Sequence, residues 1–140
     1  MNSVELARTQ VEQAVGLSAV LEVSYCAFLI LLPVIEQQQD PASPWFAQFV
    51  LAGPPAAGGR FALLDAPSLP STPADFHDSA GAHMPAGGAV AAVVGLSQVL
   101  ATRLDTAALA AGNAGDRDAC ARAAQHARDL CAKLGGAPPP

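Results

Sequence analysis

Four side chains that could carry acid–base chemistry lie within one apolar stretch, residues 14–35. Glu22 is the only ionisable carboxylate there, and Ser18, Tyr25 and Cys26 stand four residues before it, three after it and four after it. Residues three and four apart share one surface of a helix. A carboxylate desolvated among apolar side chains has a raised pKa and can exchange a proton near neutral pH. We therefore expect Glu22 to act as a general acid or base, with Ser18, Tyr25 and Cys26 lining a ligand pocket.

The alternative role for Glu22 is a structural ion pair. Arg60 and Arg103 are the nearest cations by the placement of the expected helices. A buried pair with either one would fix the register of the helices without any chemistry. Arg103 is also among the residues that we expect to bind the ligand.

A second group of candidate residues, Asp75, His77, Asp78 and His83, falls within nine positions. All four side chains are of types that bind a transition metal or transfer protons. Their spacing matches neither HExxH nor a pair of histidines on one helix, and no cysteine lies nearby, so we expect no metal and no cofactor. We expect His77 and Asp75 to take part in acid–base chemistry, and Asp78 and His83 to contact the ligand.

The composition argues against some partners. Seven basic and twelve acidic residues give a net charge of -5, which repels the phosphate backbone, so we expect no nucleic acid partner. Cys26, Cys120 and Cys131 are too few and too scattered for a disulfide framework. We expect them to be packing residues in a cytoplasmic protein.

The periodicity of apolar residues predicts an all-α fold, a small helical bundle. An aromatic content of only 5%, with abundant alanine and glycine, favours closely packed helices over sheets. The first helix is expected to begin at a Ser3 N-cap, to be about 50 Å long and apolar in its second half, and to be kinked at Pro33. The expected helices span residues 3–38, 43–52, 86–111 and 116–134.

Residues 53–85 separate the second and third expected helices. They carry six prolines and several glycines, so we expect a long irregular loop. A loop of this length is uncommon in a compact domain, so we expect it to be functional, to wrap a partner or to be partly disordered, and we place the ligand beside it. The domain is expected to span residues 1–135, followed by a tail at 136–140.

Residues 14–35 are also long enough to cross a membrane. Glu22 would cost several kcal/mol in hydrocarbon, on the order of the 2.5–3.5 kcal/mol known for such residues, and Pro33 interrupts the last turn. The next apolar run is short and rich in alanine and glycine. We therefore expect no membrane span and keep a two-helix membrane protein as an alternative.

In size and composition the chain resembles the small, alanine-rich helical proteins that act as dimeric tailoring or helper proteins in bacterial peptide or polyketide pathways, although no motif carries the resemblance. The other expected helices are too short, have mainly small side chains or are apolar on only one face, so they cannot easily enclose residues 14–35. A second copy of the chain could. We expect a homodimer that binds a small-molecule or peptide ligand, with acid–base catalysis as one form of that function. A non-catalytic protein–protein interaction module is the main alternative.

Overall fold

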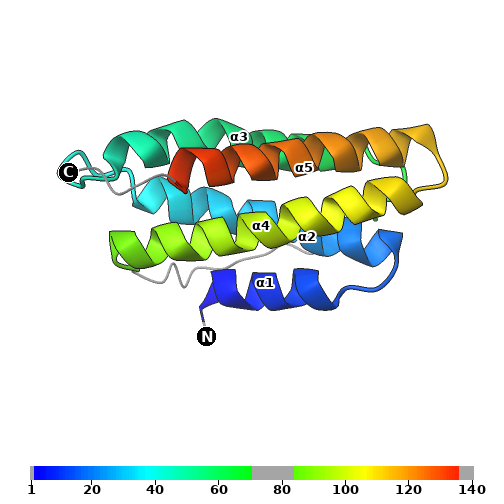
Figure 1. The fold of residues 1–140 in the computed structure, drawn as a ribbon, viewed down its shortest axis with the longest axis horizontal. Coiled ribbons are helices and arrows are strands. Elements are labelled where there is room, and N and C mark those ends of the chain that lie inside the picture. Colours follow the sequence, from blue (N-terminus) through cyan, green and yellow to red (C-terminus); the bar gives the residue numbers. More distant parts are fainter. Residues whose placement is uncertain (1, 71–83, 136–140) are drawn as a thin grey trace.

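The computed structural model describes residues 2–70 and 84–135. All of the regular elements in these ranges are α-helices, which confirms the predicted all-α fold (Figure 1). In chain order they are α1 (Ser3–Gln13), α2 (Leu17–Gln37), α3 (Phe46–Leu64), α4 (Ala86–Ala110) and α5 (Ala114–Leu134).

Four of the helices form a ring in which each packs on two neighbours. Helix α2 contacts α3, α3 contacts α5, α5 contacts α4, and α4 closes the ring on α2. Helix α1 runs antiparallel to α2 and lies outside the ring, against α2 and α4 (Figure 1). The bundle is therefore four-helical with a fifth, shorter helix covering one edge.

The apolar helix α2 is covered by helices of its own chain. Its side chains Leu21, Phe28, Leu31 and Ile35 have no exposed surface, and α1, α3 and α4 all pack against it. One copy therefore buries part of residues 14–35, including these four side chains, while Val15, Ser18 and Pro33 stay exposed. The homodimer stays a prediction.

The predicted single helix over residues 3–38 is also wrong, because the chain reverses between α1 and α2. Ala14 is extended, and Gly16 has φ 91° and ψ 153°. This backbone conformation is open almost only to glycine. Helix α1 moreover begins one residue earlier than predicted, with Asn2 and Glu5 forming a reciprocal capping box in place of the Ser3 cap.

Helix α3 continues beyond the predicted stop at Gly53 and Pro54, so the irregular segment begins only after Leu64. Pro54 and Pro55 remove the hydrogen bonds to the carbonyls of Val50 and Leu51, but those residues are exposed and water can replace the lost donors. Gly53 also has no Cβ to clash with the Pro54 ring. The prolines therefore leave the helix uninterrupted.

The prediction for α4 is confirmed to within one residue, whereas α5 begins two residues earlier than predicted. Its cap is Asn113, whose side chain accepts a hydrogen bond from the Asp116 amide. The Asp116 carboxylate is buried and accepts hydrogen bonds from the Ser68 amide at 2.9 Å and hydroxyl at 2.5 Å. Burial raises the pKa of Asp116, but the bonds from Ser68 and Asn113 outweigh it and lower the pKa overall. The segment after α3 is thereby tied to the start of α5.

Two adjacent glycines let α3 approach its neighbours. A Cβ on Gly59 would lie 2.2 Å from the ring of Phe28 in α2, and one on Gly58 would lie 2.5 Å from the imidazole of His126 in α5. No side chain fits at either position without displacing a ring. These contacts set the spacing of α2, α3 and α5.

The chain reversal at Gly16 can be tested by comparing two alanine substitutions. A Cβ would meet no atom within 4 Å at either Gly16 or Gly112, but only Gly16 has a positive φ. We expect Gly16→Ala to lower the free energy of unfolding by about 1 to 3 kcal/mol, and Gly112→Ala to change it by less than about 0.5 kcal/mol, in urea titrations. Equal effects of the two substitutions would contradict the reversal.

Candidate functional site

The predicted group around Glu22 lies on and beside the outer face of α2. Ser18 is exposed, Glu22 and Cys26 are half-buried, and Tyr25 is buried. The Tyr25 hydroxyl accepts a hydrogen bond of 3.3 Å from Arg60 Nε, and the Arg60 guanidinium also lies over the Tyr25 and Phe61 rings. The structure therefore brings Arg60 to Tyr25 and leaves Glu22 partly accessible to water.

Neither of the proposed arginine partners forms an ion pair with Glu22. Arg60 is engaged by Tyr25, and Arg103 donates a hydrogen bond to the carbonyl of Ala14. The ion pairs within residues 2–70 and 84–135 do not include Glu22. The catalytic role of Glu22 stays a prediction.

Cys26 lies one helical turn after Glu22. Burial raises the pKa of the Cys26 thiol, and the negative charge of Glu22 raises it further. A thiol with a raised pKa stays protonated at neutral pH and is a poor nucleophile. This agrees with the expectation that Cys26 lines a pocket or packs against its neighbours and does not act as a nucleophile.

The second predicted group, Asp75, His77, Asp78 and His83, lies outside the described residues. The remaining histidine, His126, packs on the backbone of Gly58. Within the described parts of the chain, no cluster of three or more histidine, cysteine, aspartate or glutamate side chains could hold a metal ion.

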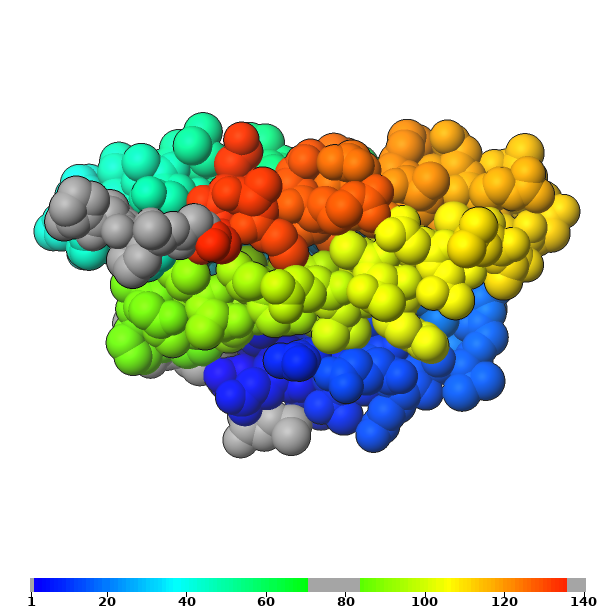
Figure 2. Space-filling model, viewed as in Figure 1, coloured from blue at the N-terminus to red at the C-terminus, as the bar shows by residue number. Residues whose placement is uncertain are grey.

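A cavity of about 390 Å³ lies where the turn between α1 and α2 meets the second half of α4. Figure 2 shows this junction, with residues 12–20 in blue below the yellow part of α4. The cavity is open on one side and most of its lining surface is apolar. Its lining residues are Glu12, Gln13, Ala14, Val15, Gly16, Leu17, Val20, Arg103, Thr106, Ala107 and Ala110.

Arg103 is the one predicted ligand-binding residue that lines this cavity. One of its Nη atoms donates to the Ala14 carbonyl, which ties α4 to the turn, and its Nε is buried with no hydrogen-bond partner. None of Ser18, Glu22, Tyr25 or Cys26 lines the cavity. Arg103 is therefore separate in the fold from the group around Glu22.

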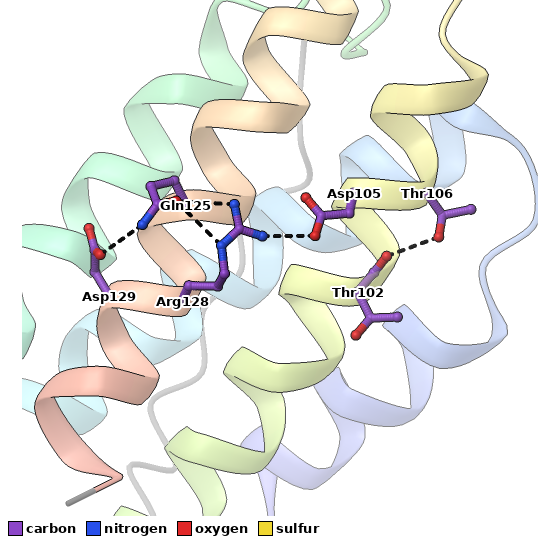
Figure 3. Close-up of polar contacts among 6 residues, drawn as sticks. All are labelled: Thr102, Asp105, Thr106, Gln125, Arg128 and Asp129. Atoms are coloured by element: carbon purple, nitrogen blue, oxygen red, sulfur yellow. Dashed lines mark hydrogen bonds and ion pairs between the residues drawn. The ribbon is translucent and has the colours of Figure 1, made fainter.

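Asp105 and Thr106, two polar side chains of α4 near Arg103, are hydrogen-bonded to other groups (Figure 3). Asp105 accepts a hydrogen bond of 2.8 Å from Arg128 of α5, and the Thr106 hydroxyl donates to the carbonyl of Thr102 at 3.0 Å. Glu12, on the opposite wall, is paired at 3.0 Å with Arg8. Arg103 consequently has no carboxylate partner among the described residues.

Sequence reasoning missed the turn that forms one wall of this cavity. The signal was Gly16, a helix breaker that follows the polar end of α1 at Glu12 and Gln13. The apolar residues after Gly16 continue a helical periodicity, which hid the break.

Comparison with known proteins adds no relative: no protein-family model, no curated protein and no solved structure matches the chain. Two of the described helices, α2 and α4, are long and apolar enough to cross a membrane. A core helix of a soluble protein meets the same criteria, and 56% of the most apolar part of α2 is buried inside the bundle. The expected lack of a membrane span stays a prediction.

The coupling between Glu22 and Cys26 gives a pH-dependent test. Glu22→Gln removes a negative charge that raises the pKa of Cys26, so we expect this pKa to fall while burial keeps it above its ordinary value. The pH profile of Cys26 alkylation, followed by mass spectrometry of the individual cysteine peptides, should move to lower pH. Stability should change by less than about 0.5 kcal/mol, since no ion pair of Glu22 is lost.

The matched control is Glu36→Gln, which removes the same charge from the exposed end of α2. It should leave the Cys26 profile unchanged. A profile that does not move in Glu22→Gln would show that the two side chains are not coupled.

Proposed function

We propose that this chain is a small-molecule-binding protein whose ligand occupies the cavity between the α1–α2 turn and α4. The observation that carries the proposal is the cavity itself, because about 390 Å³ lies within the range of small-molecule sites and its walls are mainly apolar. A cavity of about 150 Å³ holds benzene, so by the same scale this one has room for at most about 15 non-hydrogen atoms, and a ligand of about 8 to 14 fits within it.

Exposed apolar side chains near the cavity support this proposal. Val15 lines it and is 88% exposed, and Leu109, next to the lining residue Ala110, is 90% exposed. A soluble protein gains nothing from such exposure in its free state, and a ligand or partner at this end would cover part of it. The proposal covers binding only, and acid–base catalysis by Glu22, Asp75 or His77 is a separate prediction.

The proposed compartment is the reducing cytoplasm. Cys26, Cys120 and Cys131 are all free thiols. Burial and the nearby charge of Asp116 raise the pKa of Cys120 to about 11. Protected free thiols of this kind are typical of cytoplasmic proteins.

The cavity is tested by filling it. Ala107 is buried and lines the cavity, so Ala107→Leu should occupy part of the space and raise the melting temperature of the free protein. We expect ligand-observed NMR with apolar compounds of about 8 to 14 non-hydrogen atoms to detect binding to the wild-type chain and none to Ala107→Leu. Ala91→Leu adds the same bulk to an exposed part of α4 outside this cavity and should bind normally. Equal binding to all three chains would contradict the proposed site.

A second candidate function, self-association, is favoured by the outward face of α3. Val50, Leu51, Phe61 and Leu64 are 42% to 58% exposed, and Arg60 is the only charged residue in the helix. Positions 50, 54, 57, 61 and 64 follow spacings of four, three, four and three, which form one apolar stripe. A second copy suits this stripe, because a two-fold axis places identical apolar faces together.

Light scattering coupled to size exclusion tests this association. At micromolar concentration the mass should be about twice the 14.1 kDa of one chain, and Phe61→Glu should return it to that of one chain because a carboxylate would be buried in the interface. Leu109→Glu introduces the same charge at a more exposed apolar residue outside α3 and should remain dimeric. A monomeric wild-type chain would refute association through α3.

A further inference from the structure

The cavity holds one cation whose charge is not balanced by the described part of the protein. The guanidinium of Arg103 carries five N–H donors. One Nη donates to the Ala14 carbonyl, and the buried Nε has no acceptor. The nearest acidic residue on α4, Asp105, is bonded to Arg128, and Glu12 is paired with Arg8. The buried Nε has no surface that a ligand in the cavity can reach, so an anionic group there would pair with the Nη groups and supply the countercharge that the described residues do not.

The start of α2 adds to the positive potential of the same cavity. Its N-cap, Gly16, offers no side-chain acceptor, and the first turn of α2 contains no acidic residue. The first N–H groups of this 21-residue helix thus lack a capping side chain, and a helix N-terminus carries a partial positive charge. Gly16 and Leu17 both line the cavity, so this end of α2 and Arg103 belong to one site.

The remaining walls select the rest of the ligand. Leu17, Val20, Ala107 and Ala110 present apolar surface, which favours a hydrocarbon or aromatic body. Glu12 also lines the cavity, and its negative charge repels a ligand with two negative charges more strongly than a ligand with one. One unpaired guanidinium matches one carboxylate, which it can bind through two parallel hydrogen bonds.

We infer that the cavity binds a small monocarboxylate with an apolar body, on the scale of a medium-chain fatty acid or an arylalkanoic acid. The carboxylate accepts hydrogen bonds from Arg103 near the start of α2, and the apolar body lies against Leu17, Val20 and Ala107. This inference rests on the proposed function and adds the chemical class of the ligand to it.

The test compares three probes that share an eight-carbon chain and differ in charge: octanoate, octan-1-ol and octylamine. Each is titrated into the isotope-labelled full chain, and NMR follows the amides of Gly16 and Leu17 and the Nε–H of Arg103. We expect octanoate to bind at least about tenfold more tightly than octan-1-ol, the ratio that one charge-assisted hydrogen-bond pair supplies, and octylamine to bind most weakly. Octanoate should move the Arg103 Nε–H resonance, because a carboxylate paired with the Nη groups changes the electrostatic environment of the whole guanidinium.

Three variants separate charge from packing. Arg103→Met keeps an apolar stem but removes the charge, so we expect octanoate affinity to fall about tenfold or more and octan-1-ol affinity to stay unchanged. Arg103→Lys keeps the charge but loses the planar fork and should bind octanoate with intermediate affinity. Lys133→Met removes one positive charge from an exposed position of α5, outside the cavity, and should bind both probes as the wild-type chain does.

The outcomes distinguish the inference from the proposed function. If octanoate and octan-1-ol bind the wild-type chain equally, and Ala107→Leu abolishes both, small-molecule binding stands and the preference for a carboxylate is refuted. If no probe moves the cavity amides at millimolar concentration, both are refuted. Arg103 also donates a hydrogen bond to the Ala14 carbonyl, and Arg103→Met removes it. If this variant does not fold, the relative affinities of the three probes for the wild-type chain test the preference for a carboxylate.

Discussion

The reversal of the chain at residues 14–16 determines how the most apolar helix is covered. Helix α2 is buried where it faces α1, α3 and α4, and without α1 its edge beside α4 would be open to water. The positive φ of Gly16 turns α1 back along that edge, where Val4, Ala7 and Val11 become buried. One backbone conformation thereby supplies the covering helix and the cavity wall, and a single glycine makes it accessible.

The rest of the bundle depends on small side chains at helix contacts. Gly59 receives the ring of Phe28, Gly58 receives His126, and Gly95 of α4 lies against the guanidinium of Arg8 in α1. Alanines such as Ala123, Ala124 and Ala127 in the buried stripe of α5 serve the same purpose on the opposite side. With few aromatic residues to fill space, close approach of the helix backbones supplies much of the packing.

Helices marked by a periodicity of apolar residues could be predicted from the sequence. Features that depend on the tertiary surroundings of a residue could not. Helix α4 and most of the length of α5 were predicted because their apolar residues recur at helical spacing. The break at Gly16 was missed because apolar periodicity resumes directly after it, and α3 was ended early because the effect of Pro54 depends on whether the freed carbonyls reach water. Arg103 was placed in the ligand site, but its separation from Glu22 follows from tertiary packing, which spacing along the chain does not report. The predicted site over residues 75–83 lies outside the described residues.

The most direct test of this account is whether α1 folds back onto α4 of its own chain. A Cβ on Gly95 would lie 3.0 Å from Arg8 Nη1, and the Asn2 side-chain nitrogen lies 3.4 Å from the sulfur of Met84. Nuclear Overhauser spectra of labelled chains diluted in unlabelled chains record contacts within a chain only. The account predicts cross-peaks between the Arg8 side chain and the Gly95 α protons under dilution. Their absence in the folded protein, with helical shifts continuing through residues 14–16, would show one long helix and would remove both the chain reversal and the cavity.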